Sequence, residues 1–207
     1  MNPETVAAQF TRSDGRYLFA RWRRPIVPVV FGVETEALGP IKGAFEALCA
    51  LAGHPMAETD GELGANLVVF FVRQWDDLRG VPGLDRLVEG LGPLLERLEA
   101  AGANQYRVFR FEADGAIRAA TVMLRMDEHL SAVPADILAL TQAVQTILLW
   151  SDTAFLGASP LADAGGRVIL RPEIGALIRA AYDPVLPAMA TDPAHALRLA
   201  ARVGAAH

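Results

Sequence analysis

Ala65–Val72, with the sequence ANLVVFFV, is the stretch that decides the fold. It is an unbroken apolar run of strand length, which predicts a β-strand covered on both faces, as in the interior of an α/β layer. Helices are predicted on either side of it. Residues 41–52 place apolar side chains at a spacing of three to four, and residues 82–101 show a leucine-rich version of that pattern, kinked by two glycines and Pro93.

Two further strands are predicted at 105–112 and 117–126, where polar and apolar residues alternate. The linker between them contains Asp114-Gly115, which is the strongest short-range signal of a tight turn. The two strands are therefore expected to form a β-hairpin.

The segments around this core complete the domain. Residues 17–33 are predicted to be extended, because two prolines exclude a helix. The element order β-α-β-α-β-β-α indicates one α+β domain over 17–190, with a mixed sheet, a hairpin edge and packed helices. Residues 1–16 are polar and are expected to form a loose lead-in, whereas 191–207 forms a C-terminal helical tail. Residues 151–171 are predicted to be a loop.

The composition excludes several classes of protein. Of 207 residues, 52% are hydrophobic and the formal net charge is -5, so the chain is expected to fold. Cys49 is the only cysteine, which excludes a disulfide scaffold. The negative charge argues against a nucleic-acid partner. No apolar run is long enough to span a membrane and no signal peptide is visible, so the sequence as written indicates a cytoplasmic protein. No cofactor is expected.

Familiar catalytic motifs do not occur in this sequence. None of the four histidines has the i, i+4 spacing of a zinc hydrolase. They are His54, His129, His195 and His207. The sequence contains neither a nucleophile elbow nor a phosphate loop. Asp127-Glu128-His129 is interpreted as a solvated turn, and the three arginines around Trp22 as a solvated strand edge rather than a patch for single-stranded nucleic acid.

The helix predicted at 134–150, PADILALTQAVQTILLW, is the segment most relevant to function. Its spacing predicts a buried stripe of Ile137, Leu140, Val144, Ile147 and Leu148. Another face presents two glutamines among apolar neighbours, and buried amides need hydrogen-bond partners. The amides either reach solvent or a loop carbonyl, or they line a groove. The candidate groove-lining residues are Leu138, Thr141, Gln142 and Gln145.

Four short pieces of the chain carry a resemblance to a known family. They are Arg21-Trp22 with Pro25-Ile26, Ala65–Val69, Leu140–Gln142 and Leu177–Pro184. Through them the chain resembles the bacterial domain-of-unknown-function 2927 family, whose fold is related to the zincin metallopeptidases and whose members are often exported. The resemblance implies a hairpin edge beside the helix that holds H-E-x-x-H in active enzymes.

That motif is absent from the corresponding stretch of this chain. By the resemblance, Leu138 stands where the first His would be, Ala139 where the catalytic Glu would be, and Gln142 where the second His would be. Leu and Ala offer no donor atom to a cation, and no carboxylate remains to activate water. The resemblance therefore implies a peptidase scaffold without a metal and without catalysis.

Three functions are weighed on this basis. The first is a catalytically silent zincin-like module that binds a peptide or protein, with an extended peptide added to the sheet edge. The second is a structural or oligomerising subunit that uses an exposed apolar face of the tail helix at 193–203. The third is a hydrolase in which Asp152 and Asp163 of the 151–171 loop act as an acid/base pair.

Overall fold

A four-stranded mixed sheet forms the centre of the computed structural model, which describes residues 1–205. The strand order is β2 (Pro28–Phe31), β3 (Leu67–Val72), β5 (Ile117–Arg125) and β4 (Gln105–Phe111). β2, β3 and β5 run parallel, and β4 pairs with β5 in the antiparallel sense. β4 is therefore an edge strand, and β3 and β5 are interior strands.

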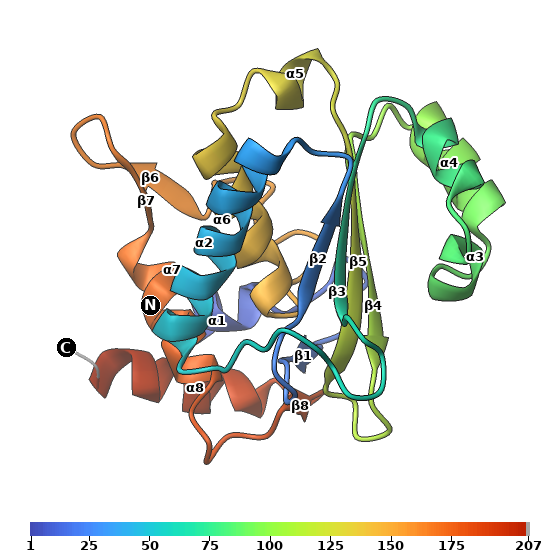
Figure 1. The fold of residues 1–207 in the computed structure, drawn as a ribbon. Helices are drawn as coiled ribbons and strands as arrows, with labels where there is room; N and C mark the ends of the chain where they lie inside the picture. The colour runs from blue at the N-terminus through green and yellow to red at the C-terminus, as the bar shows by residue number, and fades with distance from the viewer. Residues whose placement is uncertain (206–207) are drawn as a thin grey trace.

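Helices cover both faces of this sheet (Figure 1). One face carries α2 (Thr35–Ala52) and α6 (Ala135–Ile147), and the other carries the 3-10 helix η1 (Trp75–Gly80), α3 (Leu84–Leu87) and α4 (Leu91–Ala100).

The side chains of β3 divide between two apolar clusters. Leu67 and Val69 belong to the cluster on the α2 and α6 face, whereas Phe70 belongs to the cluster formed with η1, α3 and α4. Consecutive strand residues point to opposite faces, so a strand between two helical layers needs apolar residues at every position. The predicted strand over 65–72, covered on both faces, is confirmed.

The β4–β5 hairpin is also confirmed. Gly115 has a φ of +83°, and the Asp114 carboxylate accepts a hydrogen bond from the Ala116 amide at 3.1 Å. A Cβ on Gly115 would lie 2.7 Å from the Met189 side chain. Glycine is therefore required here by the backbone conformation and by the close neighbour.

Two helices differ from the sequence prediction. α2 begins at Thr35 and contains Pro40, beyond its first turn, where the missing N–H costs the helix one hydrogen bond. The single kinked helix predicted over 82–101 is wrong. Gly83 and Gly90 adopt left-handed backbone conformations, with φ of 75° and 67°. They interrupt the helix immediately before α3 and immediately before α4.

The N-terminal segment is packed into the domain. Residues 1–16 contain α1 (Pro3–Ala8), and Phe10 is fully buried and stacked on Trp150, with ring centroids 5.5 Å apart. The loose lead-in expected over 1–16 is therefore wrong, because apolar side chains in this polar stretch complete the core.

The C-terminal helix α8 (Ala194–Ala205) packs against α1 and against α7 (Pro172–Ala181). Leu199 and Val203 on its apolar side are buried in the main core. The exposed apolar face expected at 193–203 is therefore wrong, since this chain covers it. Leu197 is the large apolar residue of α8 that remains exposed.

Short elements complete the fold. They are β1 (Phe19–Ala20), α5 (Glu128–Ser131), β6 (Leu161–Asp163), β7 (Val168–Leu170) and β8 (Met189–Ala190). β1 pairs with β8, and the segment predicted as a loop over 151–171 includes the β6–β7 hairpin, which projects from the side of α6 away from the sheet (Figure 1). About 40% helix and 22% strand in one compact domain with a mixed sheet confirm the α+β class. No helix within residues 1–205 is long and apolar enough to cross a bilayer.

Candidate functional site

A groove of about 540 Å³ runs between the edge strand β4 and the C-terminal half of α6. We call it the β4 groove. β4 contributes Gln105, Arg107 and Phe109, α6 contributes Gln145, and other walls come from Arg12 and from residues within 149–156. Segments far apart in the sequence therefore meet at this site only in the folded protein.

The outer edge of β4 is unpaired. The Arg125 amide donates to the Asn104 carbonyl at 2.8 Å, which sets the hydrogen-bonding phase of the β4–β5 ladder. In an antiparallel pair, alternate residues direct their backbone groups to the partner strand and the others direct them away. Gln105, Arg107 and Phe109 therefore direct their N–H and C=O groups away from β5, and no strand within residues 1–205 pairs with them.

Arg107 is held in place by two amide side chains. Its Nη2 atom donates to Gln105 Oε1 at 3.1 Å and to Gln142 Oε1. Gln142 Nε2 also donates to Gln105 Oε1, at 3.4 Å. The buried Nε atom of Arg107 has no hydrogen-bond partner within residues 1–205. The guanidinium is therefore oriented by neutral groups and only partly satisfied.

Within residues 1–205, no carboxylate neutralises the positive charge of Arg107. Burial lowers the pKa of its guanidinium to about 10, so the group remains charged at neutral pH. Other arginines within residues 1–205 form ion pairs with carboxylates, but Arg107 forms none. Arg107 is half-buried with its Nε atom fully buried, and a charge removed from water without a counter-ion is costly, which makes it the most informative side chain of the groove.

The four residues predicted to line a groove lie in different environments in the structure. Gln145 lines the β4 groove. Gln142 is 3% exposed and lies behind Arg107, so its amide supports the groove wall rather than forming its surface. Leu138 does not line the groove, because it is buried in the core that α6 shares with α2. Thr141 is half-buried, and its hydroxyl donates to the Ile137 carbonyl one turn earlier, at 2.8 Å.

The division of α6 into a buried stripe and a groove face is only partly right. Val144, Ile147 and Leu148 are fully buried, whereas Ile137 and Leu140 of the predicted stripe are only half-buried. α6 is packed by α2 as well as by the sheet side, so a helix in this position is buried around most of its circumference.

Sequence reasoning missed Gln105 and Arg107, because polar residues that alternate along a strand are assigned to the solvent side. The available signal was Phe109. It shares the face of Gln105 and Arg107, and a face that mixes polar residues with a large aromatic one is typical of a partly covered wall.

Asp152 and Asp163, proposed as an acid/base pair, are not brought together. Asp152 lines the β4 groove, and Ser13 lowers the pKa of its carboxyl by donating from both the hydroxyl and the amide. Asp163 belongs to the β6–β7 hairpin, where it accepts from the Gly166 amide at 2.7 Å. That hairpin projects from the opposite side of α6, so the two carboxylates belong to separate parts of the surface (Figure 1).

The histidines and the cysteine are dispersed. The His54 side chain hydrogen-bonds to the Arg24 carbonyl, and His195 is buried with its Nδ1 atom 3.0 Å from the Tyr17 hydroxyl. His129 is exposed in α5, whose N-terminus is capped by Asp127. His207 lies outside the described residues. Within residues 1–205, no group of three or more His, Cys, Asp or Glu side chains is arranged to hold a metal ion. Burial raises the pKa of the Cys49 thiol to about 12.

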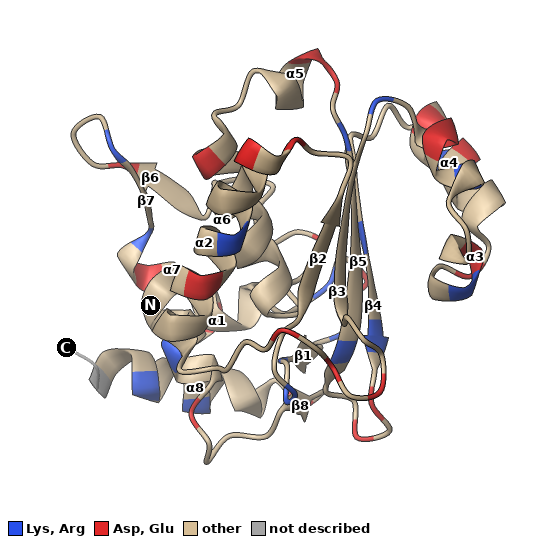
Figure 2. Ribbon diagram, viewed as in Figure 1, with Lys and Arg blue, Asp and Glu red and all other residues tan. Residues whose placement is uncertain are grey.

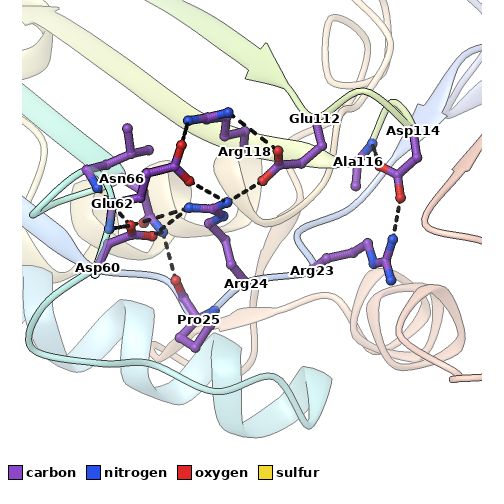
Figure 3. Close-up of polar contacts among 11 residues, drawn as sticks. Arg23, Arg24, Pro25, Asp60, Glu62, Asn66, Glu112, Asp114, Ala116 and Arg118 are labelled. Carbon is purple, nitrogen blue, oxygen red and sulfur yellow. Dashed lines mark hydrogen bonds and ion pairs between the residues drawn. The ribbon is translucent and has the colours of Figure 1, made fainter.

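The arginines around Trp22 have structural roles. Trp22 is fully buried, and its indole donates to the Thr146 carbonyl at 2.9 Å, so its ring is not available for stacking on a nucleic-acid base. Arg23 pairs with Asp114 in the β4–β5 turn (Figure 3). Figure 2 shows basic residues scattered over several elements rather than gathered in one stripe.

Arg24 lies at the centre of an ion-pair network (Figure 3). It contacts Asp60 at 3.1 Å, Glu62 at 3.2 Å and Glu112 at 2.7 Å, and Arg118 joins Glu62 to Glu112. Backbone amides of the 60–64 turn, with Arg24, lower the pKa of Asp60 to about 2. The network ties the chain before β2, the turn before β3 and the β4–β5 hairpin together, and its charges are paired.

A second groove, of about 660 Å³, lies beside the other edge strand, β2. Its lining is more apolar, and its Lys42 ammonium pairs with Glu46 at 3.7 Å. It therefore lacks the half-buried arginine without a carboxylate partner that distinguishes the β4 groove within the described residues.

Comparisons of this chain with known protein families, characterised proteins and solved structures found no match. The functional argument therefore rests on the geometry of the β4 groove.

Proposed function

We propose that this protein is a catalytically silent, zincin-like module that binds an extended peptide along the outer edge of β4. The observation that carries the proposal is the juxtaposition of an unpaired strand edge with a groove. An added strand would satisfy the outward N–H and C=O groups of β4, and its alternate side chains would enter the groove.

The zincin-like part of the proposal comes from the sequence resemblance. It is supported by a hairpin whose edge strand lies beside the helix that contains Leu138, Ala139 and Gln142. The first two side chains are packed in the core and carry no donor atom, and the third is engaged by Arg107. These residues offer no means of holding zinc or of activating water.

Strand addition is tested with N-methylated peptides. A mixture of capped heptapeptides is passed over the immobilised full chain, and retained sequences are resynthesised with N-methyl groups at alternate positions. We expect one set of methylated positions to abolish binding and the complementary set to leave it intact, because only one set of peptide amides faces β4. Equal effects of both sets would exclude strand addition.

Two measurements locate the site and test the lack of a metal. In hydrogen exchange followed by NMR, peptide binding is expected to protect the amides of Gln105, Arg107 and Phe109 and to leave those of β2 unchanged. Calorimetric titration with zinc chloride is expected to give no tight one-to-one binding. Protection confined to β2, or a tight zinc isotherm, would contradict the proposal.

A further inference from the structure

The charges of the β4 groove favour an anion. The charged side chains in its walls are Arg12, Arg107 and Asp152. The Asp152 carboxylate is already engaged by Ser13, through the amide at 3.0 Å and through the hydroxyl. Neither Arg12 nor Arg107 forms an ion pair with a carboxylate within residues 1–205. Ser13 is neutral, so Asp152 keeps its negative charge and interacts electrostatically with Arg12. Two arginines and one aspartate give the groove walls a net charge of +1, and Arg107 is the cation that this carboxylate does not offset.

Arg107 has unused hydrogen-bond donors. A guanidinium carries five N–H groups, and the described contacts engage only Nη2, with Gln105 and Gln142. Nε is buried without a partner, whereas Nη1 is neither hydrogen-bonded nor among the fully buried atoms. The two amides hold the guanidinium in a fixed orientation, with Nη1 left to donate to a ligand. Such an arrangement suits a carboxylate, because charge-assisted hydrogen bonds to Arg are strong and directional.

We infer that the β4 groove selects an acidic peptide, whose Asp or Glu side chain seats its carboxylate against Arg107. This inference rests on the proposed peptide binding and adds the chemistry of the ligand. In an added strand, the peptide residue beside Arg107 points into the groove together with residues two positions away. One of these neighbours faces Phe109, so the preferred pattern is an acidic residue separated by one position from an apolar residue.

The test uses three capped or partly capped heptapeptides on a Thr/Val background. The first is acetyl-Thr-Val-Thr-Glu-Thr-Val-Thr-amide, the second has Gln in place of Glu, and the third is the Gln peptide with a free C-terminal carboxylate. Dissociation constants for the full-length protein are measured by fluorescence anisotropy. A charge-assisted hydrogen bond in a partly buried site is expected to favour Glu over Gln by about 10-fold or more.

Matched variants assign the effect to one residue. Arg107→Gln is expected to abolish the preference for Glu, whereas Arg110→Gln is expected to retain it. Arg110 is an exposed residue on the same strand, in the opposite side-chain orientation. Hydrogen exchange of each variant establishes that β4 remains paired with β5.

The outcomes separate this inference from the proposed function. Equal binding of the Glu and Gln peptides, or a Glu preference that survives Arg107→Gln, overturns the inference and leaves strand addition standing. Absence of binding for all peptides overturns both. If only the free C-terminus strengthens binding and Arg107→Gln removes that gain, the inference of an acidic side chain is overturned as well, and Arg107 binds the peptide terminus instead.

Discussion

Replacing Arg107 by Gln is expected to change the stability of the ligand-free protein little, although the loss of a half-buried, hydrogen-bonded arginine ordinarily destabilises. Burial lowers the pKa of Arg107 from 12.5 to about 10. At about 1.4 kcal/mol for each tenfold change in the acid constant, the charge costs roughly 3 kcal/mol in the folded state. The substitution also removes hydrogen bonds to Gln105 and Gln142, each contributing about 1.5 kcal/mol because the donor is charged. The two effects nearly cancel, so the free energy of unfolding is expected to change by less than about 1 kcal/mol.

Urea denaturation at pH 7.5 measures this effect, with thermal unfolding as a second reading. For a chain of this size, a change of about 1 kcal/mol shifts the midpoint temperature by about 2–4 °C, and a shift no larger than this is expected. Arg110→Gln is the matched control and is expected to change the free energy of unfolding by less than about 0.5 kcal/mol. A loss of about 3 kcal/mol or more in Arg107→Gln would refute the reasoning, because it would show that burial of the Arg107 charge costs the folded protein nothing.

The same variant links stability to binding. An acidic peptide at a fixed, high concentration is expected to raise the midpoint temperature of the wild-type protein more than that of Arg107→Gln, since the ligand with the lower Kd stabilises the folded state more. A charge that is costly to bury in the free protein and gains a partner on binding is typical of a functional site.

Three further predictions concern the scaffold. Burial lowers the pKa of His195 to about 4, so the folded state stays neutral while the unfolded chain takes up a proton below about pH 6.5. The free energy of unfolding should therefore fall by up to about 3 kcal/mol as the pH drops from 6.5 to 4. In urea titrations, His195→Gln should reduce the dependence of this free energy on pH, whereas the control His129→Gln should leave it unchanged. An unchanged pH dependence in His195→Gln would contradict the assignment. Asn66→Ala should cost about 2–4 kcal/mol in urea denaturation, because the buried amide accepts one backbone hydrogen bond at 2.8 Å and donates another at 2.8 Å; a loss below about 1 kcal/mol would mean that water replaces both. Phe10→Ala should cost about 3–5 kcal/mol in the same assay, whereas a negligible loss would remove the N-terminal segment from the core.

Local patterns predicted much of the fold. The apolar run at 65–72 requires two covering layers, and Asp114-Gly115 requires a tight turn, because both depend on neighbours in the sequence. The errors lie where side chains distant in sequence determine the structure. The polar composition of residues 1–16 predicts a loose segment, yet Phe10 fills a space beside Trp150 that only the folded chain creates.

The candidate site was predicted less completely than the fold. The interest in Gln142 and Gln145 came from the requirement that buried amides have partners, and Gln142 does have them. The identity of those partners was not predictable, since Gln105 and Arg107 precede α6 by more than 30 residues and their strand reads as solvent-facing on one side.

By itself, the sequence determined the central strand, the β4–β5 hairpin and the α+β class, and it showed that the helix beginning near 134 has no side chains suited to a zinc-peptidase motif. Only the tertiary structure decided that β4 is the edge strand of that hairpin, that its outward backbone groups border a groove, and that an arginine in that groove has no acidic partner within residues 1–205. The physical reason is the distance along the sequence between the residues that interact. Secondary structure follows from side-chain periodicity over a few residues, whereas the charge balance of a groove depends on which distant segments fold against it.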